Sequence, residues 1–372
     1  GADNGLGVAT IMAILESDSI AHPALEALFT IDEETGMTGA MGLKGGLLQG
    51  EILLNLDTEE DDEIGVGCAG GIDVTAIKHY ETEAASDTGV TYTITVKGLQ
   101  GGHSGMDIIK GLGNANKMMN RVLHQCQSVV HIAELQGGSL RNAIPRESVA
   151  MVIVEPQEEA TFTSAFQNIS EAIAEEYKLL EPSLEIVFEK SASAATSVMS
   201  QKDQAEFLKT IYGLHNGVYR MSPAIEDLVE TSNNIAKVIV KDGSIKVECL
   251  TRSSVHSSKL NMANTLQAVF ELAGFEVSFS GEYPGRAPNM ESPILKVLDG
   301  IYEKLNGEKA HVAACHAGLE CGILGQNYPK MDMISFGPTI KGAHSPDERA
   351  SISSTQKFWN FVLEILKEIP KK

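Results

Sequence analysis

Short apolar runs separated by glycine-rich turns make up most of the first 72 residues. The runs 27–31 and 52–56 predict β-strands, and apolar positions between residues 6 and 15 predict a preceding helix. Strands that are apolar on both faces are typical of an α/β sheet covered by helices on each side. Acidic residues follow both runs, and ligands bind at the carboxyl ends of strands in such sheets. The pattern therefore predicts an α/β sheet with acidic residues at its ligand-binding edge.

The pattern changes near residue 73. Residues 90–96 alternate between apolar and polar side chains, as a half-exposed strand does. The order strand, helix, two strands, helix, strand follows, and residues 228–280 repeat much of it. The expected strands are 90–96, 129–136, 147–155, 184–188, 228–240, 244–252 and 276–280, and the expected helices are 108–127, 157–180 and 256–274. This order predicts an internally duplicated α+β domain.

The α/β pattern resumes after Gly285. We expect helices at 291–305, 316–325 and 353–368, strands at 310–314 and 331–336, and a loop at 337–350. The predicted fold class is therefore α/β, with a central mixed sheet in a catalytic domain formed by residues 1–72 and 289–372. Residues 73–288 would form an inserted, internally duplicated α+β lid domain of the kind that also serves in dimerisation.

Composition narrows the classes of function. The chain carries 50 acidic and 29 basic residues, and its formal charge of -21 would repel nucleic acid and an anionic membrane surface. Its five cysteines form no CxxC pair, which argues against a disulfide framework and favours a reducing compartment. No apolar run reaches the roughly 18 residues of a membrane helix, and the amino end does not resemble a signal peptide. We therefore expect a cytoplasmic protein that binds neither nucleic acid nor membranes.

Five residues at expected strand ends or in loops could form a centre for two divalent metal ions. They are Asp3, Glu33, Glu34, Asp57 and His344. Such a centre needs a bridging carboxylate, further carboxylate and imidazole ligands, and a carboxylate near the attacking water. Because Glu33 and Glu34 are adjacent, one could bind metal while the other acts as general base. Each motif alone is more often a solvated turn than a site, but the set in this order favours a metal centre.

A series of motifs, in this order, is similar to that of one branch of the M20 metallopeptidases, the aminoacyl-histidine (Xaa-His) dipeptidases. The motifs are GADNG at 1–5, DEETG at 32–36, NLD at 55–57, GHSG at 102–105, HAGLECG at 316–322, SFGPTI at 335–340 and HSPDE at 344–348. The resemblance covers essentially the whole chain. It implies an enzyme with a metal-binding catalytic domain and an inserted lid domain.

The resemblance also implies roles for the matching residues. The implied metal ligands are Asp3 as the bridge, Glu34 and Asp57 as terminal ligands, and His344 as a further ligand. Glu33 would be the general base. Zinc is the expected ion, although manganese or cobalt would accept the same ligands. The family's remaining metal-binding histidine and aspartate lie in a His-x-Asp motif that would precede Gly1, so we expect a truncated product whose metal content and activity stay open.

Other residues are candidates for contacts with a substrate. In the family, the histidine that matches His103 stabilises the oxyanion, although a loop histidine is more often plain surface. Relatives place a polar substrate contact at Asn142. Arg252, at a predicted strand end, could pair with the carboxylate of a peptide or form an ordinary surface salt bridge. The turn at Gly318 could hold a substrate carboxylate at a helix amino terminus, or its flanking His316 and Glu320 could cap that helix.

The expected activity is metal-dependent hydrolysis of the peptide bond in short, unblocked dipeptides, with the preference for Xaa-His dipeptides implied by the branch. The partner would be a small peptide substrate. The protein could be a monomer or a homodimer, because a duplicated lid could supply both His103 and Arg252 from one chain. The alternatives are another M20 activity, tripeptidase or N-acyl-amino-acid hydrolase, and a non-catalytic binding module. Arg286 stands where close relatives are expected to carry tryptophan, and we interpret it as a hinge residue without an assigned role.

Overall fold

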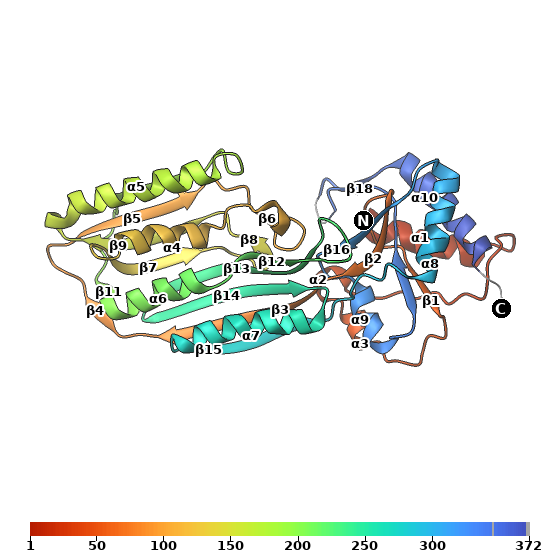
Figure 1. Cartoon of the computed structure of the whole chain (residues 1–372), viewed down its shortest axis with the longest axis horizontal. Helices are drawn as coiled ribbons and strands as arrows, with labels where there is room; N and C mark the ends of the chain where they lie inside the picture. The colour runs from red at the N-terminus through yellow and green to blue at the C-terminus, as the bar shows by residue number, and fades with distance from the viewer. Residues whose placement is uncertain (344–345, 370–372) are drawn as a thin grey trace. The chain divides into compact units, whose positions relative to one another are not determined.

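The computed structural model describes residues 1–343 and 346–369, and of Glu34 and Thr35 it describes the backbone alone. The chain divides into two compact units, and Figure 1 shows their elements. Unit 1 comprises Gly1–Gly70, Ser222–Leu228 and Tyr283–Lys372, and unit 2 comprises Gly71–Met221 and Val229–Glu282. The sequence-based division placed residues 222–228 in the inserted domain, but Ile225 packs against the core of unit 1.

A four-stranded sheet forms the centre of unit 1, in the order β1-β17-β2-β16. Its strands are β1 (Ile52–Asn55), β2 (Glu63–Cys68), β16 (His311–Cys315) and β17 (Asp332–Ser335). β1 pairs in parallel with β17, and β16 pairs in parallel with β2, whereas β17 and β2 are antiparallel. The central sheet is therefore mixed, and this confirms the predicted fold class.

Helices pack on both faces of this sheet. Met333 of β17 belongs to one apolar cluster, and the next residue, Ile334, belongs to another. Because successive strand residues point to opposite faces, the two clusters lie on opposite sides. The Ile334 cluster includes α8 (Pro293–Asn306) and α10 (Ile352–Glu368), and the Met333 cluster includes α3 (Thr38–Gly42) and α9 (Glu320–Asn327). Both faces are thus covered, as the apolar runs predicted.

The strand predicted at residues 27–31 is wrong. No described strand pairs with this run, and Phe29 and Ile31 are 49% and 73% exposed. A strand needs a neighbouring strand to satisfy its backbone groups, and an apolar pattern cannot supply one. The helix expected from residues 6–15 does form as α1 (Ala2–Glu16). The run 27–31 leads instead into the short helix α2 (Glu33–Gly36).

Unit 2 is built on a nine-stranded sheet in the order β10-β5-β9-β7-β13-β14-β3-β15, with β12 (Gly217–Met221) added beside β13. Two sets of elements share the order strand, helix, strand, strand, helix, strand. The first set is β5 (Val90–Lys97), α4 (Ala115–Cys126), β7 (His131–Gly137), β9 (Ser148–Val154), α5 (Glu159–Tyr177) and β10 (Glu185–Lys190). The second set is β3 (Gly70–His79), α6 (Gln201–Gly213), β13 (Val229–Lys241), β14 (Ser244–Ser253), α7 (His256–Leu272) and β15 (Glu276–Tyr283).

The two sets occupy this sheet in matching order. β10-β5-β9-β7 corresponds strand for strand to β15-β3-β14-β13, and β7 and β13 pair antiparallel where the halves meet. Along the chain, the first set lies between β3 and α6 of the second set, so the duplication is nested. The helices α4, α5, α6 and α7 lie over one face of the sheet, where they enclose one large apolar core (Figure 1).

Some predicted boundaries change. The helix expected at 108–127 is interrupted: a 3-10 turn η1 (Ile108–Lys110) ends at Gly111, and α4 begins only at Ala115. Gly111 has φ +67°, a left-handed conformation that ends a helix. The remaining short elements are β4 (Thr82–Ala84), β6 (Gly102–His103), β8 (Ala143–Ile144), η2 (Pro156–Glu158), β11 (Ser197–Met199), β18 (Ile340–Lys341) and β19 (Arg349–Ala350). Within the described ranges, no helix is both long and apolar enough to cross a bilayer.

Candidate functional site

Asp57 lies at the carboxyl edge of the unit 1 sheet. It follows β1, which runs parallel to β17 with Asn55 opposite Ser335. The side-chain amide of Asn55 donates to Ser335 Oγ over 3.2 Å and joins the two strand ends. The segment 337–350 follows β17 and therefore leaves the sheet at the same edge. The fold brings Asp57 and the segment that carries His344 to one edge, although His344 itself lies outside the described residues.

The segment that carries Glu33 contacts the turn that carries Gly318. Thr30 Oγ1 donates to Glu320 Oε2 over 2.8 Å. A Cβ on Gly318 would lie 3.4 Å from Cε of Met37, so the turn passes close to the end of α2. The structure thus places the expected general base and the expected substrate turn on adjacent segments of unit 1.

Glu320 is not a helix cap, contrary to one alternative from the sequence. The amino-terminal cap of α9 is Leu319, which makes no side-chain cap hydrogen bond. Burial raises the pKa of Glu320, and the hydrogen bond from Thr30 acts in the opposite direction. Glu320 Oε1 is shielded from solvent and has no hydrogen-bond partner among the described residues. Burial of the Glu320 carboxylate therefore costs free energy, and among the described residues the hydrogen bond from Thr30 offsets part of that cost.

Asp3 lies in the first turn of α1, beside Glu348. The backbone N–H of Ala2 donates to the Glu348 carboxylate, and Asp3 N lies 3.5 Å from Glu348 Oε1. Glu348 belongs to the same loop as His344, so this loop contacts the Asp3 turn. Sequence reasoning gave Glu348 no role, although its place in the motif HSPDE was an available signal.

The chemistry of the described donors fits divalent metal ions. Asp3 and Asp57 offer carboxylate oxygens, which zinc and manganese accept, and both lie near the segment 337–350. Among the described side chains, no group of three or more His, Cys, Asp or Glu residues could hold a metal ion. The expected set also includes Glu34 and His344, whose side chains are outside the description. The ligand set therefore stays a prediction.

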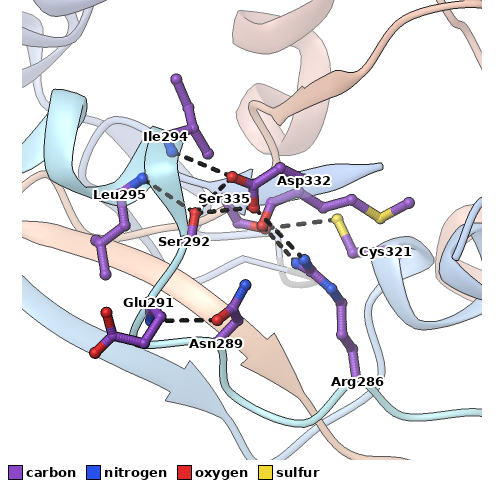
Figure 2. Close-up of polar contacts among 10 residues, drawn as sticks. Arg286, Asn289, Glu291, Ser292, Ile294, Leu295, Cys321, Asp332 and Ser335 are labelled. Atoms are coloured by element: carbon purple, nitrogen blue, oxygen red, sulfur yellow. Dashed lines mark hydrogen bonds and ion pairs between the residues drawn. The ribbon is translucent and has the colours of Figure 1, made fainter. Parts of the chain in front are cut away.

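Arg286 anchors the returning chain to the unit 1 sheet, as Figure 2 shows. Its backbone N–H donates to Cys68 O over 2.8 Å, and its carbonyl accepts from Cys68 N over 3.0 Å. Its guanidinium donates to the carbonyl of Met333, and Nη2 lies 3.9 Å from Asp332 Oδ1. Asp332 in turn accepts from Ser292 Oγ, with both carboxylate oxygens at 2.8 Å. Arg286, which the sequence left without an assigned role, therefore has an anchoring role within unit 1.

Unit 2 brings His103, Asn142 and Arg252 into one cluster. β6 pairs antiparallel with β8 so that His103 stands opposite Ala143. The backbone N–H of Ser104 donates to the carbonyl of Asn142 over 2.7 Å. Arg252 Nη2 lies 3.4 Å from His103 Nε2, although 149 positions separate the two residues. Three residues that the sequence proposed separately are therefore neighbours.

Both ring nitrogens of His103 have hydrogen-bond partners. The N–H groups of Gly105 and Met106 donate to His103 Nδ1 over 3.2 and 3.1 Å. These two contacts favour the neutral tautomer with its hydrogen on Nε2, whereas the hydrogen bond from Arg252 Nη2, which can only donate, uses Nε2 as the acceptor. The guanidinium of Arg252 and the imidazole of His103 therefore meet at one place. A guanidinium beside an imidazole suits a ligand that carries negative charge.

Asp107 holds the loop of His103 in place. Its Oδ2 accepts from the backbone N–H of His103 over 2.7 Å, and its Oδ1 accepts from Lys110 Nζ over 2.6 Å. Burial acts to raise the pKa of Asp107, but the hydrogen bonds from Lys110 and His103 hold it below the usual value. The carboxylate therefore stays charged at neutral pH and keeps both contacts.

Comparisons with known proteins show the family of the chain. Residues 2–368 match the family described as "Peptidase family M20/M25/M40". Over 374 residues the chain is 40% identical to the cytosol non-specific dipeptidase of Escherichia coli (strain K12), and the match covers 100% of this chain and 77% of that protein. The crystal structure of an aminoacylhistidine dipeptidase from Vibrio alginolyticus is similar with a TM-score of 0.93 and 42% identity, over 100% of this chain and 76% of that chain.

A more distant structure shares the fold alone. The aminopeptidase PepT from Bacillus cereus is 14% identical with a TM-score of 0.51, over 99% of this chain and 71% of that chain. The family match and the two close relatives confirm the resemblance found in the motifs. The chain belongs to peptidase family M20/M25/M40 and is a metal-dependent peptide hydrolase.

Proposed function

We propose that this chain is a cytoplasmic dipeptidase that uses two divalent metal ions to hydrolyse short, unblocked dipeptides, Xaa-His dipeptides among them. The observation that carries the proposal is the contact between His103 Nε2 and Arg252 Nη2, which lie 3.4 Å apart. Two relatives support the finer assignments by name, one as a cytosol non-specific dipeptidase and one as an aminoacylhistidine dipeptidase. The substrate class is therefore inferred from the pair of His103 and Arg252 and from similarity together.

The residues of unit 2 would recognise and polarise the peptide. Arg252 would pair with the carboxylate of the substrate through its two-pronged fork. Because Arg252 is only 4% exposed, water would screen this pair weakly. His103 would donate its Nε2 hydrogen to the carbonyl oxygen as negative charge develops there. Asn142 would add a polar contact, and since one chain supplies all three residues, the active form could be a monomer or a homodimer.

The residues of unit 1 would carry out the proton transfers. Glu33 would accept the proton of the attacking water and return it to the leaving amine. The proposed metal ligands are Asp3, Glu34, Asp57 and His344. Bound ions would lower the pKa of the water and polarise the scissile carbonyl. Zinc is the first expectation, and manganese or cobalt would accept the same donors.

The test replaces Arg252 by alanine and compares free dipeptides with amidated dipeptides. A hydrogen bond to a charged group contributes about 1.5–3 kcal/mol, so kcat/KM on free dipeptides should fall roughly ten- to a hundred-fold. The loss on amidated dipeptides should be much smaller. Arg252→Lys should restore part of the activity, because an ammonium cannot reproduce the two-pronged fork.

Arg220→Ala is the matched control, because Arg220 is an exposed arginine of unit 2 that pairs with Glu230 over 3.5 Å. It should leave both rates unchanged. Equal losses on free and amidated substrates with Arg252→Ala would contradict the carboxylate role and would move it to the Gly318 turn. A panel that includes tripeptides and N-acylated amino acids separates the other M20 activities from a dipeptidase.

A further inference from the structure

A run of polar residues is buried in the middle of the unit 2 sheet. Thr231, Ser232, Asn233 and Asn234 of β13 are each at most 1% exposed. Buried polar side chains are costly unless hydrogen bonds satisfy them. Their partners therefore indicate what this part of the strand holds in place.

Asn234 binds both carbonyls that flank Asn142. Its Nδ2 donates to Arg141 O over 3.2 Å and to Ala143 O over 2.8 Å. Its Oδ1 lies 3.4 Å from Nδ2 of Asn114, which orients the amide so that its two hydrogens face the loop. One side chain thus fixes the backbone on both sides of the expected substrate contact.

The same loop also carries the position of His103. Ala143 stands opposite His103 in the β6–β8 pair, and Ser104 N donates to Asn142 O. Displacement of the 141–143 backbone would therefore be passed to His103 through this pair. Asn234 supports this loop from β13, a strand in the centre of the sheet.

Asn234 and Arg252 belong to the same face of that sheet. Ser232 is the cross-strand partner of Arg252, and Asn234 is two positions further along the same strand. Residues two apart on a strand point to the same face. The sheet therefore positions Arg252 directly, and it positions Asn142 and His103 through Asn234.

We propose that Asn234 is a positioning residue that sets Asn142 and His103 relative to Arg252. The proposal rests on the function proposed above for those three residues. It assigns no contact between Asn234 and the substrate. In this role, the amide donors of Asn234 hold the 141–143 backbone at a fixed position relative to Arg252.

The neighbouring Asn233 offers a matched control. It is equally buried in the same strand, its Nδ2 donates to His215 O over 2.7 Å, and its Oδ1 accepts from Thr251 Oγ1 over 3.1 Å. It points to the opposite face, and the loop that it holds carries none of the candidate site residues. Asn233→Asp and Asn234→Asp remove the same donors and preserve the same shape.

The experiment measures kcat and KM on free dipeptides for both variants, together with their thermal unfolding. Both should be less stable to a similar degree, since each puts an unpaired acid beside a carbonyl. Only Asn234→Asp should lower kcat, by about ten- to a hundred-fold, because a displacement on the order of 1 Å can cost about a hundred-fold in rate. KM should change less than about three-fold, because Arg252 still binds the carboxylate.

A second readout does not depend on turnover. Hydrogen exchange at the Ser104 amide, which donates to Asn142 O, should accelerate at least about ten-fold in Asn234→Asp and stay unchanged in Asn233→Asp. Asn234→Ser, which retains one donor, should lie between wild type and Asn234→Asp in both measurements. Asn234→Ser also tests the proposal if Asn234→Asp does not fold.

Equal losses of kcat in the two aspartate variants, or an unchanged kcat in Asn234→Asp and Asn234→Ser, would overturn the proposal. The outcome is separable from the proposed function through Arg252→Ala. If Arg252→Ala lowers kcat/KM selectively on free dipeptides while the Asn234 variants behave as wild type, only the positioning role fails. If Arg252→Ala shows no selectivity, the carboxylate role proposed for Arg252 fails.

Discussion

Removal of the Asp332 carboxylate should destabilise unit 1 measurably. Asp332 begins β17 and accepts from Ser292 Oγ at 2.8 Å and from the backbone N–H of Ile294 at 3.1 Å (Figure 2). Ser292 is the amino-terminal cap of α8, so the carboxylate ties the start of that helix to the sheet. Oδ1 of Asp332 also lies 3.9 Å from Arg286 Nη2.

The magnitude follows from these contacts. Hydrogen bonds to a charged group contribute about 1.5–3 kcal/mol. The favourable position at a helix amino terminus adds about 0.3–1 kcal/mol, and an ion pair at this distance adds at most about 1 kcal/mol. We therefore expect Asp332→Ala to lower the free energy of unfolding of unit 1 by about 3 kcal/mol. Asp332→Asn, which keeps an acceptor but no charge, should lose roughly half of that, since neutral hydrogen bonds are weaker.

The assay uses the single tryptophan of the chain. Trp359 lies on α10 and packs against the core of unit 1, so its fluorescence during urea unfolding reports on this unit. Asp299→Ala is the control, because Asp299 lies on α8 and, among the described residues, makes a surface pair with Lys309 at 3.9 Å. Its expected cost is below about 0.5 kcal/mol. A loss in Asp332→Ala no larger than that of the control would refute the assignment of Asp332 as an anchor.

The other predictions concern chemistry and pH. Glu33→Gln should keep metal content, measured on the purified protein, while turnover falls about 10²- to 10⁴-fold; loss of metal would instead make Glu33 a ligand. Because burial raises the folded-state pKa of Glu320, its contribution to stability is present at low pH and is lost as pH rises through that pKa. Glu320→Gln should therefore raise the urea midpoint of Trp359 fluorescence more at pH 7 than at pH 4, and a pH-independent change would contradict this. Burial also raises the pKa of Cys68 to about 12. Iodoacetamide should therefore modify the half-buried Cys315 at least about ten times faster than Cys68 in the native protein. Equal rates would show that Cys68 is accessible.

In the duplicated domain, the sequence pattern predicts most elements but not how they are grouped. Strands such as β5, β9, β13 and β14 alternate or run apolar over enough residues to be predicted within a few positions. The first two elements of the second set, β3 and α6, were not assigned to it. The whole first set separates them from β13 along the chain, so only the pairing of strands in the sheet reveals that they belong together.

Residues 27–31 show a different limit. The run has the composition of a buried strand, yet it pairs with no described strand and remains partly exposed. Composition and periodicity measure what a segment could bury. Whether it becomes a strand depends on a neighbour at hydrogen-bonding distance, which is a property of the tertiary structure.

The sequence by itself determined the family, the α/β class with its mixed sheet, and the identity of the candidate residues, because these depend on residue types and their order. Only the tertiary structure decided which of these residues meet. It placed His103 and Arg252 3.4 Å apart across 149 positions. It also showed that Arg286 is an anchor and that Asn234 holds the Asn142 loop. The physical reason is that contacts between distant segments are set by strand pairing and core packing, which local patterns of apolar and polar residues do not encode.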